Sequence, residues 1–141
     1  MDNNFEFILK ATGVVTSPNN PATGNYPHNL EKTQTIEVEK GKILRLEFTH
    51  FAVAVGDCDI TDCLCDFVKI TDGDGTTLMN NSCGYSRDPF DSLYFLPPNI
   101  TTRSNSVEIF FHTNDDIAAS GWNLSWSAVT PGVKDLILNS I

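Results

Sequence analysis

The chain has few charged side chains and, among these, few bases. Only 19% of its 141 residues are charged, and 9 Lys and Arg stand against 18 Asp and Glu, which gives a formal net charge of −9. A surface with this balance repels the phosphate backbone, so nucleic acid is not an expected partner. The same charge favours cationic partners, such as metal ions or Lys and Arg side chains, and it also serves simple solubility.

Long hydrophobic runs are absent as well. No window approaches the roughly 18 apolar residues of a membrane-spanning helix, so no membrane insertion is expected. The start, Met-Asp-Asn-Asn-Phe-Glu, has neither the basic nor the apolar segment of a signal peptide. Together with the cysteines and sequons described below, this start leads us to expect the mature part of a secreted protein, with Met1 as an added start.

Catalytic motifs are also missing. The three histidines, His28, His50 and His112, are not accompanied by Gly-x-Ser-x-Gly or His-Glu-x-x-His, and no pair of carboxylates stands out. The sequence thus predicts no enzyme.

Cysteines are absent before Cys58, and all four lie between Cys58 and Cys83. Their C-x4-C-x-C spacing differs from the two separate C-x2-C pairs of most zinc sites, so disulfides in an oxidising compartment are favoured over a metal. Four cysteines allow three pairings, and the spacing does not choose between them. Three N-x-Ser/Thr sequons agree with a secreted protein and mark Asn80, Asn99 and Asn123 as candidate glycosylation sites.

Short runs with alternating polarity predict strands. The runs cover residues 5–9, 13–18, 33–38, 43–48, 51–55, 67–70, 93–95, 107–112 and 122–128. Residues 18–28 form a loop, 39–42 a hairpin turn, and the Thr-Asp-Gly-Asp-Gly stretch after Ile70 a tight turn. Because the strands are short and no body segment keeps a helical period, we predict an all-β fold, a two-sheet antiparallel β-sandwich.

The alternation also predicts which side chains face the core and places Asn123 toward solvent. The predicted core residues are Leu44, Leu46, Phe48, Val68, Ile70, Val107, Ile109, Phe111, Trp122, Leu124 and Trp126.

Five short motifs follow one another along most of the body. They are Ser17-Pro18-Asn19 with Tyr26-Pro27, Lys40-Gly41 with Leu44-x-Leu-x-Phe48, Cys63-x-x-Asp66-x-Val-x-Ile-x-Asp-Gly73, Cys83-Gly84, and Phe111-His-Thr-Asn114 with Gly121-Trp122-x-x-x-Trp126. In this order they resemble a CUB domain. The resemblance implies a jelly-roll type sandwich over residues 1–130. Residues 131–141 would be a tail, either one turn of amphipathic helix or a linker to a further domain.

The resemblance also implies a disulfide pairing. Matching Cys63 to the family's third cysteine pairs Cys63 with Cys83, which leaves Cys58 and Cys65 as a second bridge. The family's usual N-terminal disulfide is missing, because Lys32 stands at the position of its second cysteine.

Many CUB domains bind one calcium ion, and this chain matches that site in part. Tyr26 and Asp66 match, but Ala54 replaces the usual glutamate and Asn114 the second aspartate. Calcium takes six to eight oxygen ligands, so each lost carboxylate weakens the site. We expect little effect of calcium and partner binding that survives its removal, unless the missing charge comes from Asp57, Asp59, Asp62 or Asp115.

For function, the resemblance implies a non-catalytic extracellular recognition module that mediates protein–protein contacts, often through a lysine of the partner. Such a module can belong to a larger secreted protease or receptor. The alternative is a free-standing carbohydrate-binding protein of the spermadhesin type, with exposed aromatic rings as the sugar platform. Trp122 and Trp126 lie on an alternating strand, which favours core packing over that platform.

Overall fold

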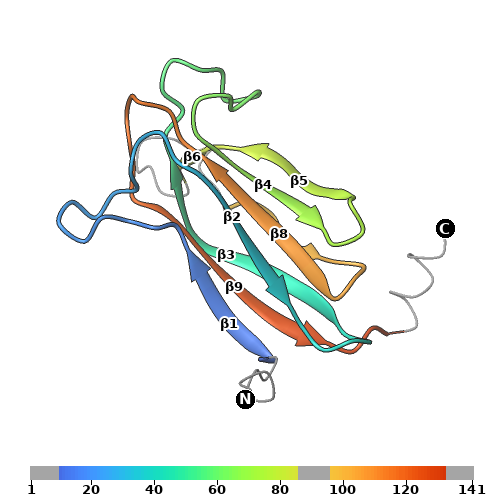
Figure 1. Cartoon of the computed structure of the whole chain (residues 1–141). Coiled ribbons are helices and arrows are strands. Elements are labelled where there is room, and N and C mark those ends of the chain that lie inside the picture. Colours follow the sequence, from blue (N-terminus) through green and yellow to red (C-terminus); the bar gives the residue numbers. More distant parts are fainter. Residues whose placement is uncertain (1–9, 86–95, 133–141) are drawn as a thin grey trace.

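The computed structural model describes residues 10–85 and 96–132, so the strands predicted at 5–9 and 93–95 and most of the predicted tail lie outside the described residues. Within these ranges the chain forms β-strands stacked in two layers (Figure 1). They are β1 (Thr12–Thr16), β2 (Glu31–Glu37), β3 (Ile43–Val53), β4 (Phe67–Asp72), β5 (Thr77–Ser82), β6 (Gly84–Tyr85), β7 (Ile100–Thr101), β8 (Ser106–His112) and β9 (Gly121–Val129).

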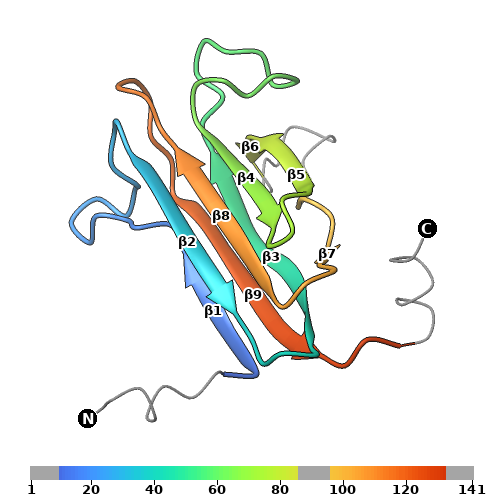
Figure 2. The ribbon, with the colours of Figure 1, turned by 45° about the vertical axis from the view of Figure 1, so that its right-hand side comes forward.

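The strands build two antiparallel sheets. One sheet has the order β1-β9-β3-β6, with β7 also paired to β3, and the other has the order β2-β8-β4-β5. Figure 2 shows the two sheets lying face to face. The predicted antiparallel β-sandwich is confirmed. In the described part of the chain no helix is long and apolar enough to cross a membrane.

The turn at residues 39–42 is present, but the hairpin predicted there is wrong. The Lys42 N–H donates to the Glu39 carbonyl at 3.0 Å, yet β2 and β3 belong to different sheets, so the chain crosses here from one layer to the other. The turn after β4 does join neighbours, β4 and β5, and its Gly75 has a φ of +94°. Turn residues set the local reversal, but the sheet that receives the next strand depends on distant partners.

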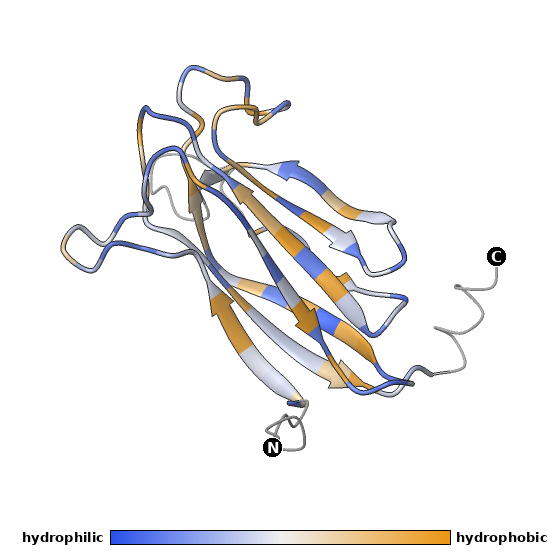
Figure 3. Ribbon diagram, in the orientation of Figure 1, coloured by the Kyte–Doolittle hydropathy of each residue, from blue (hydrophilic) through white to orange (hydrophobic). Residues whose placement is uncertain are grey.

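The core lies between the sheets, and hydrophobic residues alternate with polar ones along the strands (Figure 3). In β3 the buried positions shift from Leu44, Leu46 and Phe48 to Phe51 and Val53, because the pairing with β9 shifts register between Phe48 and His50. Such a bulge inserts one residue and so changes the face that later side chains take.

Ten of the eleven predicted core residues are buried. Trp122 lies at the centre, with its ring edge-to-face against Phe48 at 6.2 Å and against Phe111 at 5.8 Å. The exception is Trp126, which packs against the core but is only partly buried. It pairs with Gly13 of the edge strand β1, where a Cβ would lie 2.6 Å from the indole ring. Trp126 therefore covers the margin of the core, over a glycine that leaves room for it.

Because Trp122 is buried and Trp126 is not, we predict different costs for the two truncations. Trp122→Ala should lower the free energy of unfolding by about 3–5 kcal/mol, and Trp126→Ala by clearly less. Asn123, exposed between buried Trp122 and Leu124, gives the control Asn123→Asp, expected to change stability by less than about 0.5 kcal/mol. Urea unfolding followed by circular dichroism measures all three. Unfolding caused by Asn123→Asp would mean that the register of β9 is wrong by one.

Candidate functional site

Three loops meet at one end of the sandwich, which we call the loop end (Figure 1, upper left). They are residues 17–30 between β1 and β2, 54–66 between β3 and β4, and 113–120 between β8 and β9. Backbone hydrogen bonds tie the first loop to the third: the Tyr26 N–H donates to Ala119 at 3.1 Å, and the Asn29 N–H donates to Asn114 at 2.9 Å. These two loops are therefore fixed against each other.

A buried hydrogen-bond network joins all three loops. The Tyr26 hydroxyl donates to Oδ2 of Asp66 at 2.6 Å and accepts the Ala54 N–H at 2.9 Å. The other carboxylate oxygen, Oδ1, accepts the Asn114 N–H at 2.8 Å. Tyr26 and Asp66 are both buried, and the Tyr26 ring packs edge-on against Phe111 at 4.9 Å. Each oxygen of a buried carboxylate thus has a donor, as such a group requires.

Burial and the hydrogen bond to Asp66 raise the pKa of Tyr26 above its ordinary value. Both effects act in the same direction, because a buried phenolate beside a carboxylate is disfavoured. Tyr26 is therefore a neutral donor over the physiological range.

The sequence-predicted metal residues come together only in part. Tyr26, Asp66 and Asn114 converge, whereas Asp57 and Asp115 are exposed. The Asn114 side-chain carbonyl accepts the Asp116 N–H at 3.1 Å and so caps its own loop. Across residues 10–85 and 96–132, no three His, Cys, Asp or Glu side chains form a group that could hold a metal ion.

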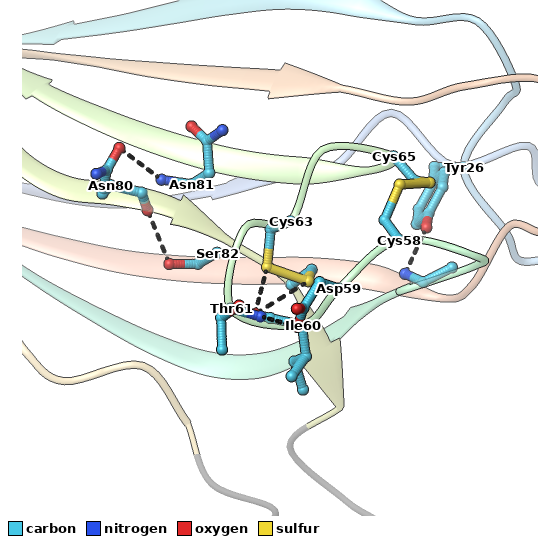
Figure 4. Close-up of a disulfide and its surroundings, with 12 residues drawn as sticks. Tyr26, Cys58, Asp59, Ile60, Thr61, Cys63, Cys65, Asn80, Asn81 and Ser82 are labelled. Carbon is cyan, nitrogen blue, oxygen red and sulfur yellow. Dashed lines mark hydrogen bonds between the residues drawn. A yellow bond between two sulfur atoms is a disulfide. The ribbon is translucent and has the colours of Figure 1, made fainter.

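Two disulfides clamp the loop between β3 and β4 (Figure 4). Cys58 pairs with Cys65 inside the loop, and Cys63 pairs with Cys83, which lies between β5 and β6. This is the pairing that the resemblance implies. Asp59 caps a turn within the loop, because its side chain accepts the Thr61 N–H at 3.0 Å, and this hydrogen bond lowers the pKa of its carboxyl group.

The loop that the two disulfides hold, residues 54–66, carries exposed apolar side chains that the sequence analysis did not predict. Leu64 is 64% exposed and Ile60 is 60% exposed, and Ile117 on the neighbouring loop is exposed too. Each of these residues follows an acidic residue or a cysteine, and no alternating pattern of a strand marks it in the sequence. The sequence signal that could have identified Leu64 is its position between two cysteines, Cys63 and Cys65.

We predict that the Tyr26 hydroxyl stabilises the fold and makes it sensitive to alkali. Tyr26→Phe leaves the Ala54 N–H and one Asp66 oxygen without this partner, which should cost about 1–3 kcal/mol at pH 7. Above about pH 10 an unfolded tyrosine loses its proton while folded Tyr26 keeps it, so stability falls as pH rises. Tyr26→Phe should remove that part of the alkaline loss in urea titrations.

The matched control is Tyr85→Phe, since Tyr85 is 43% exposed. It should change stability little at pH 7 and keep most of the alkaline loss of the natural chain, because the charge of Tyr85 is the smallest of the causes that shift the pKa of Tyr26. Equal alkaline behaviour of the two variants would contradict the assignment to Tyr26.

Comparison with known proteins places this geometry in a family. The family model for the CUB domain matches residues 4–126. Cubilin of Rattus norvegicus is 27% identical over 124 residues, which cover 88% of this chain and 3% of cubilin. Mannan-binding lectin serine protease 1 of Homo sapiens is 33% identical over 121 residues, covering 86% of this chain and 15% of the protease. The chain thus spans a small fraction of the curated relatives it matches.

A solved structure gives the same result. The crystal structure of the MASP-1 CUB2 domain bound to Ca²⁺ matches with a TM-score of 0.66 and 29% identity, covering 85% of this chain and 95% of that one. Sequence and structure agree, and the chain belongs to the CUB family of extracellular protein-interaction modules.

Proposed function

We propose that this CUB domain is a non-catalytic recognition module that binds a protein partner through its loop end, within a larger secreted protease or receptor. The partner contributes an apolar pocket and a Lys or Arg side chain. The observation that carries the proposal is the exposed Leu64 on a loop held by two disulfides. The relatives named above are far longer than the segment they share with this chain, which supports the placement in a larger protein.

Leu64 has the properties of a preorganised anchor. Its neighbours Cys63 and Cys65 belong to different disulfides, so the backbone is held on both sides while the side chain is 64% exposed. A held loop loses little conformational freedom on binding, and a few buried apolar anchors carry most of the free energy of an interface. Ile60, on the same loop, enlarges the apolar contact.

The charge of the loop end selects a cationic partner. Residues 17–30, 54–66 and 113–120 contain no Lys or Arg. A surface of one sign attracts the opposite sign and raises the association rate. The exposed acids are Asp57, Asp59, Asp62, Asp115 and Asp116.

Calcium does not take part in the proposed contact, because the residues present do not fit the ion. Ala54 is buried and brings no side-chain oxygen, so Asp66 is the only carboxylate left among the matched calcium positions. The side-chain oxygen of Asn114 caps its own loop. The Tyr26–Asp66 network and the two disulfides hold the loop end instead.

This account predicts the effect of restoring the lost carboxylates. About 1 mM calcium should leave the melting temperature of the natural chain nearly unchanged. Ala54→Glu with Asn114→Asp should be less stable in EDTA, since a buried carboxylate lacks a partner, and should recover in calcium. A Kd of about 0.1 mM would give about 1.4 kcal/mol at 1 mM. A large shift of the natural chain would show that an exposed aspartate has replaced the missing glutamate.

The partner contact is tested with a panel of secreted and cell-surface ectodomains, screened in EDTA beside a glycan array. Leu64→Ala should weaken the protein partner it finds by about 10-fold or more. Val14→Ala is the matched control, because Val14 is also 64% exposed but lies on β1, and it should leave affinity unchanged. Asp59→Asn should lower the association rate and its salt dependence.

Three results would contradict the proposal: binding insensitive to Leu64→Ala, binding lost in EDTA, or glycan binding with no protein partner. The last would favour the carbohydrate-binding alternative.

A further inference from the structure

A shallow polar groove crosses the outer face of the sheet that contains β3 and β9. Its volume is about 270 Å³, and its walls come from β3, β9 and residues 99–101. Register places Ser127 beside Arg45 and Arg45 beside Thr101, so these outward side chains form one row across three strands. The groove lies toward the start of β3, whereas the loop end follows its last residue. The polar side chains around the groove are Arg45, Glu47, Asn99, Thr101, Ser125 and Ser127.

Two glycosylation sequons meet at this groove. Asn99-Ile100-Thr101 contributes its asparagine and its threonine to the lining, and Asn123-Leu124-Ser125 contributes its serine. Asn123 is the preceding outward position on β9, about 7 Å from Ser125 by strand geometry. Asn99 and Asn123 are both exposed. Two candidate acceptors that are distant in sequence therefore border one hollow.

We propose that an N-linked glycan on Asn99 seats its first N-acetylglucosamine in this groove, and that a second glycan on Asn123 covers the adjoining part of the same face. In the attachment step the Asn99 Nδ2 forms a bond to C1 of an oligosaccharide carried on a polyprenyl diphosphate. The C1–O bond to the diphosphate breaks, the diphosphate leaves with the electron pair, and the amide proton passes to the transferase.

The chemistry of the groove suits a neutral sugar. Arg45 supplies donors, Glu47 supplies acceptors, and the hydroxyls of Thr101, Ser125 and Ser127 supply both, which matches the hydroxyl and acetamide groups of the sugar. The volume lies just below the range of typical ligand sites, so it suits one or two rings. Attachment to Asn99 makes the contact intramolecular, so even a weakly binding groove is occupied.

The consequence is a division of the surface. The glycans block protein partners from the outer face of the β3–β9 sheet, whereas the loop end remains accessible to them. This inference does not depend on the partner contact proposed above, since it concerns a different face and a different ligand.

The test uses protein secreted from cells that attach N-glycans. Thr101→Ala destroys the Asn99 sequon, and Thr101→Ser is the matched control that keeps it. Intact mass should show a glycan on Asn99 in the natural chain and in Thr101→Ser, and none in Thr101→Ala. After an endoglycosidase trims each glycan to one N-acetylglucosamine, the natural chain should melt about 2–5 °C above Thr101→Ala.

A double-mutant cycle assigns this difference to the groove. With Arg45→Ala in the background, restoring the Asn99 glycan should raise the melting temperature by less than half as much. The inference is overturned if Asn99 carries no glycan, if the trimmed and sugar-free forms melt together, or if Arg45→Ala leaves the difference intact.

Discussion

The loop end depends on one buried carboxylate. Asp66 receives a hydrogen bond on each oxygen, from the Tyr26 hydroxyl and from the Asn114 N–H, and Tyr26 in turn receives the Ala54 N–H. A buried charge is tolerated only when donors replace the water it has lost. Because its two donors come from the other two loops, the requirements of one carboxylate fix the relative positions of all three loops.

The disulfides extend this order to the solvent-facing side. One bridge closes the loop on itself, and the other ties it to Cys83 beyond β5. Leu64 is thereby held with its side chain 64% exposed, so most of this apolar surface is left unburied by the fold. Hydrogen bonds therefore order the buried side of the loop end and disulfides its solvent-facing side, and the proposed partner contact uses the exposed residue between the two bridges.

Local patterns predicted the parts of the fold that local physics decides. The alternation in β8 and β9 named the buried residues correctly except for Trp126, and the two runs predicted at 43–48 and 51–55 lie in one strand, β3, whose pairing a bulge shifts between them. The short strands β5 to β7 were missed because polar residues such as Asn80 and Asn81 carry no alternation. The supposed hairpin failed because sheet membership is decided by distant pairing. The convergence of Tyr26, Asp66 and Asn114 followed from family resemblance, since these residues are far apart in the chain.

The central claim is that hydrogen bonds and disulfides, rather than calcium, order the loop end. Amide hydrogen exchange of residues 54–66 and 113–120 tests it most directly, measured in calcium and in EDTA for the natural chain and for Tyr26→Phe. The account predicts equal protection of the natural chain in both buffers and faster exchange in Tyr26→Phe. Protection that disappears in EDTA, and that Tyr26→Phe leaves unchanged, would contradict it.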